Sequence, residues 1–86
     1  MSVLRKLRQA MTHQDRWVVR CEYTDQAGNT TIRIISPIRL AGPGPDRVVA
    51  LCLGREEPRQ FVLSRMSTVE LVLASSVQMP EPVEEI

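Results

Sequence analysis

Residues 59–73 read RQFVLSRMSTVELVL. Phe61 and Leu63 share one face of a strand over residues 59–63, and Val69, Leu71 and Leu73 share one face over residues 68–73, and this period of two is that of a β-strand. The break between the two runs, residues 64–67, is short enough for a single 3₁₀ turn. A last strand that follows its neighbour after so tight a break is typical of small Sm-like barrels, so this stretch predicts a small β-barrel.

Three more strands are predicted upstream of this pair. The first alternates strictly, the second is rich in β-branched residues, and the third is almost continuously apolar, as in a strand buried on both faces. They span residues 17–23, 30–36 and 47–53. In the second strand the alternation predicts that Ile32 and Ile34 face the core, opposite Arg33. Gly28 marks the hairpin turn before this strand, because glycine adopts positive φ without strain.

A helix is predicted over residues 3–13, before the strands. Leu4, Leu7 and Met11 recur with the spacing i, i+3, i+7 that lines one face of a helix, and Ser2 is a suitable N-cap. Because a free helix of this length is marginal in water, we expect it to dock against the sheet. Its basic residues fall on the remaining faces, where a solvated surface is the simplest interpretation.

The predicted fold is therefore mainly β, a five-stranded Sm-like barrel with one N-terminal helix in a single domain of residues 1–76. An open antiparallel sheet covered by the helix is the alternative. Pro37 ends the second strand or places it at a barrel corner or an edge, because proline lacks the amide donor that a central strand needs. Residues 77–86, with Pro80 and Pro82 among the glutamates, are predicted to form a disordered acidic tail.

Charge is distributed unevenly along the chain. The formal net charge is +1, but eleven basic residues stand against seven acidic ones before the acidic tail, an excess of four positive charges. Such a mildly basic body suits an anionic ligand and falls short of the strongly basic stripe of a typical DNA binder. The sequence has no apolar run of the ~20 residues that span a membrane and no signal-peptide core at its start, so we expect a cytoplasmic protein.

The residues that usually carry catalysis are sparse. Cys21 and Cys52 lie inside apolar strand patterns and are expected to be buried free thiols, and His13 stands alone at the helix end. Two cysteines and one histidine this far apart form no zinc site. Residues 42–45 contain two prolines, which lack the amide donors of a phosphate-binding loop. We therefore expect no enzyme activity, no metal and no cofactor.

Arginines near the predicted strand ends are the best candidates for binding. Arg59 shares a strand face with Phe61 but lies at the start of the strand, so it should emerge at the barrel rim. Arg65 lies in the tight turn, and Arg33 lies on the second strand. Because guanidinium groups bind carboxylate and phosphate through paired hydrogen bonds, the three could form an anion cradle. The alternative is that each is solvated or paired with a carboxylate.

From residue 18 to residue 72 the chain resembles a WYL domain, the Sm-like module found in many bacterial transcriptional regulators. Residues 59–66, RQFVLSRM, are similar to the family pattern Arg-x-Phe-x-Leu-Asp-Arg-Ile. The first hairpin is similar in the residues Glu22, Tyr23, Gly28, Arg33, Pro37 and Leu40. Asp46-Arg47-Val48 occupies the positions of the family's Trp-Tyr-Leu triplet, so Arg47 stands where the family has a tyrosine.

The resemblance implies a ligand-sensing or nucleic-acid-binding regulatory module, with nucleotides or single-stranded nucleic acid as the favoured ligands. The residues implied at the ligand are Arg33, Arg47, Arg59, Arg65 and Tyr23. Because nothing in the sequence precedes the helix where typical members have a winged helix-turn-helix, we expect a divergent, free-standing member, with a regulator protein in trans as a candidate partner, and a domain cut from a longer chain is the alternative. The alternative function is a protein–protein interaction or oligomerisation module without a small ligand, since such barrels pair through edge strands.

Overall fold

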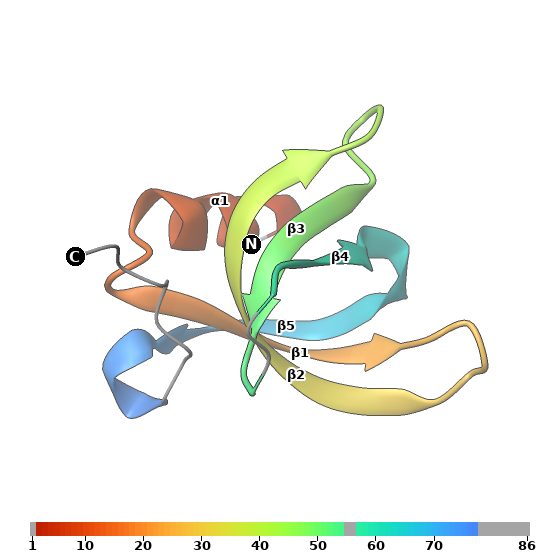
Figure 1. Cartoon of the computed structure of the whole chain (residues 1–86). Coiled ribbons are helices and arrows are strands. Elements are labelled where there is room, and N and C mark those ends of the chain that lie inside the picture. The colour runs from red at the N-terminus through yellow and green to blue at the C-terminus, as the bar shows by residue number, and fades with distance from the viewer. Residues whose placement is uncertain (1, 55–56, 78–86) are drawn as a thin grey trace.

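The computed structural model describes residues 2–54 and 57–77, which form one antiparallel sheet with an N-terminal helix packed against it (Figure 1). The elements are α1 (Val3–Thr12), β1 (Trp17–Thr24), β2 (Thr30–Ala41), β3 (Arg47–Cys52), β4 (Arg59–Val62), the 3₁₀ turn η1 (Leu63–Arg65), β5 (Met66–Leu73) and the 3₁₀ turn η2 (Ala74–Ser76). The five strands lie in the order β4-β3-β2-β1-β5, and each neighbouring pair is antiparallel. The predicted class, mainly β with five strands and one N-terminal helix, is confirmed.

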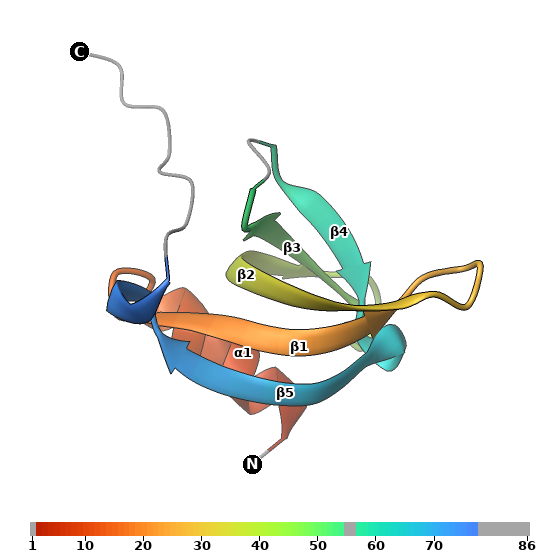
Figure 2. The same cartoon turned by 90° about the horizontal axis from the view of Figure 1, so that it is seen from below.

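The sheet is bent, but its hydrogen-bonded ladder does not close into a barrel. Among the described residues, β4 and β5 are the two edge strands. The ladder stays open because η1 carries the chain directly from β4 to β5, and β5 pairs with β1 instead of β4. β2 and β3 rise out of the plane of β1 and β5 (Figure 1), and the view from below shows β4 and β5 on opposite sides of β2 (Figure 2). The concave side of this bent sheet holds the core.

The helix begins and docks as its sequence pattern predicts. The Oγ of Ser2 accepts a hydrogen bond from the backbone N–H of Arg5 at 3.2 Å, which confirms Ser2 as the N-cap. Leu7 and Ala10 are fully buried, and α1 contacts β1, β2 and β5. The helix is therefore held by its apolar face and not by its intrinsic helix propensity, as expected for a segment so short.

β2 is longer than predicted, because it runs through Pro37 to Ala41 instead of stopping before the proline. Pro37 lies opposite Ala50, and the register with β3 shifts between Pro37 and Arg39. The missing amide of proline is tolerated at such an irregularity, and the Pro37 carbonyl accepts a hydrogen bond from Gln14 Nε2 at 3.1 Å. Pro37 thus marks a corner within a continuous strand, and the end of β2 predicted at residue 36 is wrong.

The tight turn before the last strand is confirmed as η1, and β5 then begins at Met66, two residues earlier than predicted. The register between β5 and β1 shifts opposite residues 20–22, and Thr68 has φ +50° there. This irregularity is a β-bulge, which adds one residue to β5. The extra residue allows both Met66 and Val69, three positions apart, to point into the core, where each is buried.

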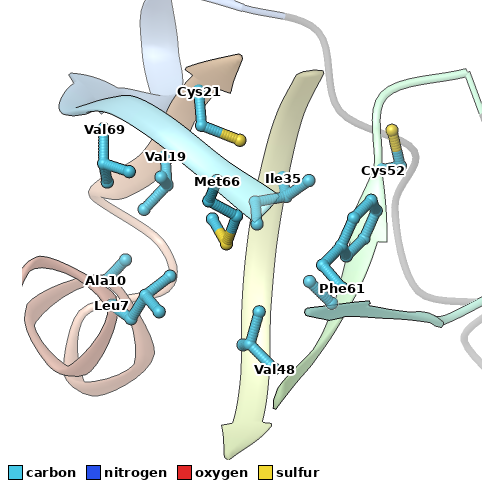
Figure 3. Packing of buried hydrophobic residues seen from close by; sticks show 11 residues of the cluster. Leu7, Ala10, Val19, Cys21, Ile35, Val48, Cys52, Phe61, Met66 and Val69 are labelled. Carbon is cyan, nitrogen blue, oxygen red and sulfur yellow. The ribbon is translucent and has the colours of Figure 1, made fainter. Parts of the chain in front are cut away.

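The core fills the concave side of the sheet and the interface with α1 (Figure 3). Its buried members are Leu7, Ala10, Val19, Cys21, Ile35, Val48, Ala50, Cys52, Phe61, Met66 and Val69. The prediction that Ile32 and Ile34 face the core is wrong, because Ile35 is fully buried and Ile32 is 60% exposed. The pairing of Ile35 with Val19 fixes this parity, and it places the charged Arg33 on the core-facing side, where alternation within the strand does not predict it.

Beyond Val77 the chain lies outside the described residues, and so does the predicted acidic tail from residue 78 onward. In the part of the chain that the structure describes, no helix has the length and apolar character needed to cross a membrane.

Candidate anion-binding site

Arg33 and Arg59 lie on the concave face of the sheet. Arg33 of β2 is opposite Cys21 in β1, and Arg59 of β4 is opposite Ala50 in β3. Directly opposed residues of antiparallel strands share a face, and both Cys21 and Ala50 are buried in the core. Arg33 is half-buried and Arg59 is exposed. The structure therefore brings these two predicted site residues to one face.

The thiols of Cys21 and Cys52 lie on the same concave face and form its buried floor, because Cys52 is opposite the core residue Ile35. Both are free and buried, as predicted. Figure 3 shows them at the end of the core away from Leu7 and Ala10 of α1. We call Arg33, Arg59 and these two thiols the arginine face.

The charge of Arg33 reaches the Cys21 thiol. The pKa of Cys21 is raised from 9.0 to about 11, mainly by burial and also by nearby Cys52, while Arg33 acts in the opposite direction and lowers it. The Nε of Arg33 donates to Thr31 Oγ1 at 3.0 Å, which directs the side chain along the concave face. With so high a pKa, Cys21 stays protonated at neutral pH and is a structural thiol, not a nucleophile.

Arg65 holds the β1–β2 turn from the side of η1. Its Nη1 donates to the carbonyl of Asp25 at 2.9 Å and to that of Thr24 at 3.4 Å. The turn is also closed from within, because Asp25 Oδ1 accepts a hydrogen bond from the backbone N–H of Asn29 at 2.9 Å, and Gly28 has φ +87°. Arg65 is thus fixed by backbone carbonyls through Nη1, one of the three nitrogens of its guanidinium.

Tyr23 is occupied by contacts within the protein. Its ring packs edge-on against Phe61, with ring centroids 5.2 Å apart and planes at 90°, a favourable geometry for aromatic pairs. Its hydroxyl accepts a hydrogen bond from the backbone N–H of Val62 at 3.0 Å. Since Tyr23 lies in β1 and Val62 in β4, this side chain joins the two strands across the open side of the sheet.

Arg47 lies on the opposite, convex face, away from Arg33 and Arg59. It is opposite Val62 in β4, and its neighbour Val48 is fully buried in the core, so the alternation of the strand turns Arg47 outward. Its Nε lies 3.2 Å from Asp46 Oδ1, and its Nη1 donates to Gln60 Oε1 at 3.1 Å. The structure does not bring Arg47 together with the other predicted site residues.

The ion pairs of the described residues do not involve the arginines of the arginine face. Within residues 2–54 and 57–77, the carboxylates that contact an arginine are Glu70, at 3.8 Å from Arg20, and Asp46, beside Arg47. Arg33, Arg59 and Arg65 therefore have no carboxylate partner within 4.0 Å among the described residues. Among the described residues, pairing with a carboxylate therefore applies to Arg47 and not to these three arginines, and solvation is the alternative to an anion cradle that stays open for them.

Sequence reasoning misjudged Lys6, which it assigned to the solvated faces of the helix. Its Nζ donates to the backbone carbonyl of Val69 in edge strand β5 at 2.5 Å. A helix-face pattern says which residues turn inward but not which strand edge they meet, so no signal in the sequence predicts this bond. The proximity of Cys21 to Arg33 was equally hidden, because alternation within one strand does not reveal the register between two.

No three His, Cys, Asp or Glu side chains are grouped as metal ligands in the described part of the chain. What the structure presents is a small bent β-sheet with a basic concave face, which is the architecture of a binding module. The sequence model of the WYL domain matches residues 2–71, and the chain therefore belongs to the WYL domain family. A comparison with curated proteins finds no match.

Membership confirms the resemblance seen in residues 59–66. WYL domains are generally regulatory, ligand-sensing modules and are not typically enzymes. They are associated with nucleic acids or with regulatory proteins. The apolar third position of the family triplet is retained here in kind, since Val48 is fully buried, while Arg47 stands on the surface in place of the tyrosine.

Proposed function

We propose that this domain senses an anionic ligand, a nucleotide or a short single-stranded nucleic acid, through the arginine face. The observation that carries the proposal is the placement of Arg33 and Arg59 on one concave face without a carboxylate partner among the described residues. Guanidinium groups in such a position favour phosphate, because they offer paired donors and full charge at any physiological pH.

The other predicted ligand residues take different parts in this proposal. Arg65 adds its unused donors from the neighbouring turn, Tyr23 positions β4 and hence Arg59, and Arg47 contributes positive charge from the convex face. The module acts without catalysis, in the cytoplasm, and passes its state to a regulator protein. The excess of four positive charges before residue 78 supports attraction of an anion over long range.

Fluorescence anisotropy with a labelled oligothymidylate over a salt series tests the proposal. We expect affinity to fall as salt rises, with a log–log slope of roughly −0.7 per phosphate contact. Arg59→Ala should weaken binding by about 1–3 kcal/mol, roughly 5- to 150-fold. The melting temperature should stay nearly constant, because Arg59 is exposed.

Arg39→Ala is the matched control. Arg39 is an exposed arginine of the same sheet, but it lies opposite Val49 on the convex face, so its loss should change affinity little. Lys6 is unsuitable as a control because of its bond to the Val69 carbonyl. Absence of binding at low salt by a protein that circular dichroism shows to be folded would remove this function.

A protein-interaction module is the second candidate, and the convex face favours it. Ile32 is 60% and Leu53 is 40% exposed. The backbone N–H of Leu53, just after β3, donates to the carbonyl of Ile34 at 2.8 Å, so Leu53 lies beside Ile34, two residues along β2 from Ile32. Light scattering coupled to size-exclusion chromatography would reveal association of copies, and Ile32→Asp should abolish it if this face is the interface. Salt should weaken such association little, because apolar contacts are not screened.

A further inference from the structure

The three aromatic rings of this chain all belong to described residues, so their availability to a ligand can be followed completely. They are Trp17, Tyr23 and Phe61. Proteins that bind single strands usually stack bases on such rings, and each stacked base strengthens binding by about 5- to 150-fold. The exposure of a ring beside the arginine face therefore decides whether a bound nucleic acid could stack its bases on the protein.

Tyr23 and Phe61 are the rings nearest the arginine face, and they pack against each other. Phe61 is only 5% exposed, and the edge of one ring meets the face of the other at a centroid distance of 5.2 Å. The hydroxyl of Tyr23 is also bonded to the Val62 amide. Phe61 therefore offers a base almost no surface, and the half-buried ring of Tyr23 is held in one orientation by its contacts with β4.

Trp17 lies at the far end of β1. It is four residues from Cys21, or about 13 Å along an extended strand, and it is opposite Leu73 in β5. The guanidinium carbon of Arg16 lies 5.6 Å from the centre of its ring. One ring is therefore distant from Arg33 and already has a cation over it, the ring of Phe61 is buried, and the half-buried ring of Tyr23 is packed against Phe61.

We infer that the ligand of the arginine face is recognised through its phosphate groups and not through its bases. This inference rests on the proposed function and narrows it to a phosphate-bearing anion that needs no nucleobase. A phosphodiester chain without bases, inorganic polyphosphate and an ordinary oligonucleotide then offer the same chemistry to Arg33 and Arg59. Base identity contributes little to the affinity.

Competition against a labelled oligothymidylate at low salt tests the inference with three unlabelled probes. These are the same oligothymidylate, an abasic chain of equal phosphate number, and inorganic polyphosphate of similar length. We expect the abasic chain to compete within about twofold of the oligothymidylate, and polyphosphate to compete as well. Arg59→Ala should weaken all probes alike, and Arg39→Ala should weaken none of them.

The emission of Trp17, the single tryptophan, gives an independent measurement on the unmodified protein. It should stay unchanged on saturation with oligothymidylate, because stacking would quench it. A loss of tenfold or more for the abasic chain, or quenching of Trp17, overturns the inference while leaving the proposed function intact. If no probe binds, the proposed function fails and the inference fails with it.

Discussion

At the scale of the residue, the arginines of this domain differ in the face of the sheet on which they lie and in the groups that they contact. Arg33 and Arg59 lie on the concave face without a carboxylate, Arg65 bonds to turn carbonyls, and Arg47 is paired with Asp46 on the convex face. All carry the same charge, so chemistry alone does not separate them. The number of hydrogen-bond donors that each arginine can offer to a ligand depends on the bonds that it already makes within the protein.

The hydroxyl of Tyr23 should be measurable as a structural bond. Tyr23→Phe keeps the ring against Phe61 but leaves the Val62 N–H without its acceptor. An unsatisfied, partly buried donor costs about 1–3 kcal/mol, so the urea midpoint should fall by a corresponding amount. If the midpoint is unchanged, the bond between β1 and β4 contributes nothing to the fold.

The ring of Phe61 should contribute more to the stability of the fold than the hydroxyl of Tyr23 does. Phe61→Ala removes a ring that is 5% exposed, and such core truncations cost about 3–5 kcal/mol. Thermal melting should drop sharply, by more than it does for Tyr23→Phe. An unaltered melting temperature would contradict the assignment of Phe61 to the core.

The raised pKa of the Cys21 thiol predicts that the domain loses stability at alkaline pH. Its folded-state pKa of about 11 lies above the ordinary 9.0, so the folded protein holds this proton more tightly than the unfolded chain does. The stabilisation is complete below about pH 9 and is lost as pH rises through 11. Between pH 8 and pH 10.5, the wild type should lose about 1–2 kcal/mol more than Cys21→Ala in chemical denaturation. Equal losses would exclude the thiol as the cause.

At the scale of the element, β2 and β5 show how tertiary contacts override local signals. β2 continues through Pro37 because a bulge and the Gln14 side chain accommodate the proline. β5 gains a bulge at Thr68, which turns both Met66 and Val69 inward. Each irregularity bends the sheet, and the bend produces the concave face on which the arginines lie.

The helix depends on the sheet, and a pair of variants should show this. Leu7→Ala removes a fully buried side chain and should destabilise the domain by about 2–5 kcal/mol, since large-to-small changes leave a cavity. Arg8→Ala, one position along on the exposed side of α1, should change stability by less than about 0.5 kcal/mol. Denaturant titration of both variants measures the difference. Similar effects of the two would mean that α1 is not docked through Leu7.

At the scale of the whole molecule, two side chains occupy backbone groups at the open edges of the sheet. Tyr23 accepts from the Val62 amide in β4, and Lys6 donates to the Val69 carbonyl in β5. Unpaired edges invite pairing with other chains, and occupied ones resist it. Each of these bonds occupies one backbone group of an edge strand, which works against pairing of another strand at that point.

The sequence by itself determined the class of the fold, the helix with its Ser2 cap, the number of strands and the membership of the family. These are local properties, because alternation, capping and turn chemistry act over a few residues. The sequence also predicted the arginines of the candidate site, because Arg33, Arg59 and Arg65 match arginines in the family pattern.

Only the tertiary structure decided that Ile35 and not Ile32 is in the core, that Arg47 is separated from Arg33, and that Tyr23 bonds to β4. Each of these depends on the register between strands or on a contact across the sheet. A slip of one residue exchanges the faces of a strand, and in the run Ile32 to Ile35 the charged Arg33 lies on the same face as the buried Ile35, so alternation alone predicts the wrong face. Register is set where strands from distant parts of the chain pack together, and that packing is a property of the folded molecule.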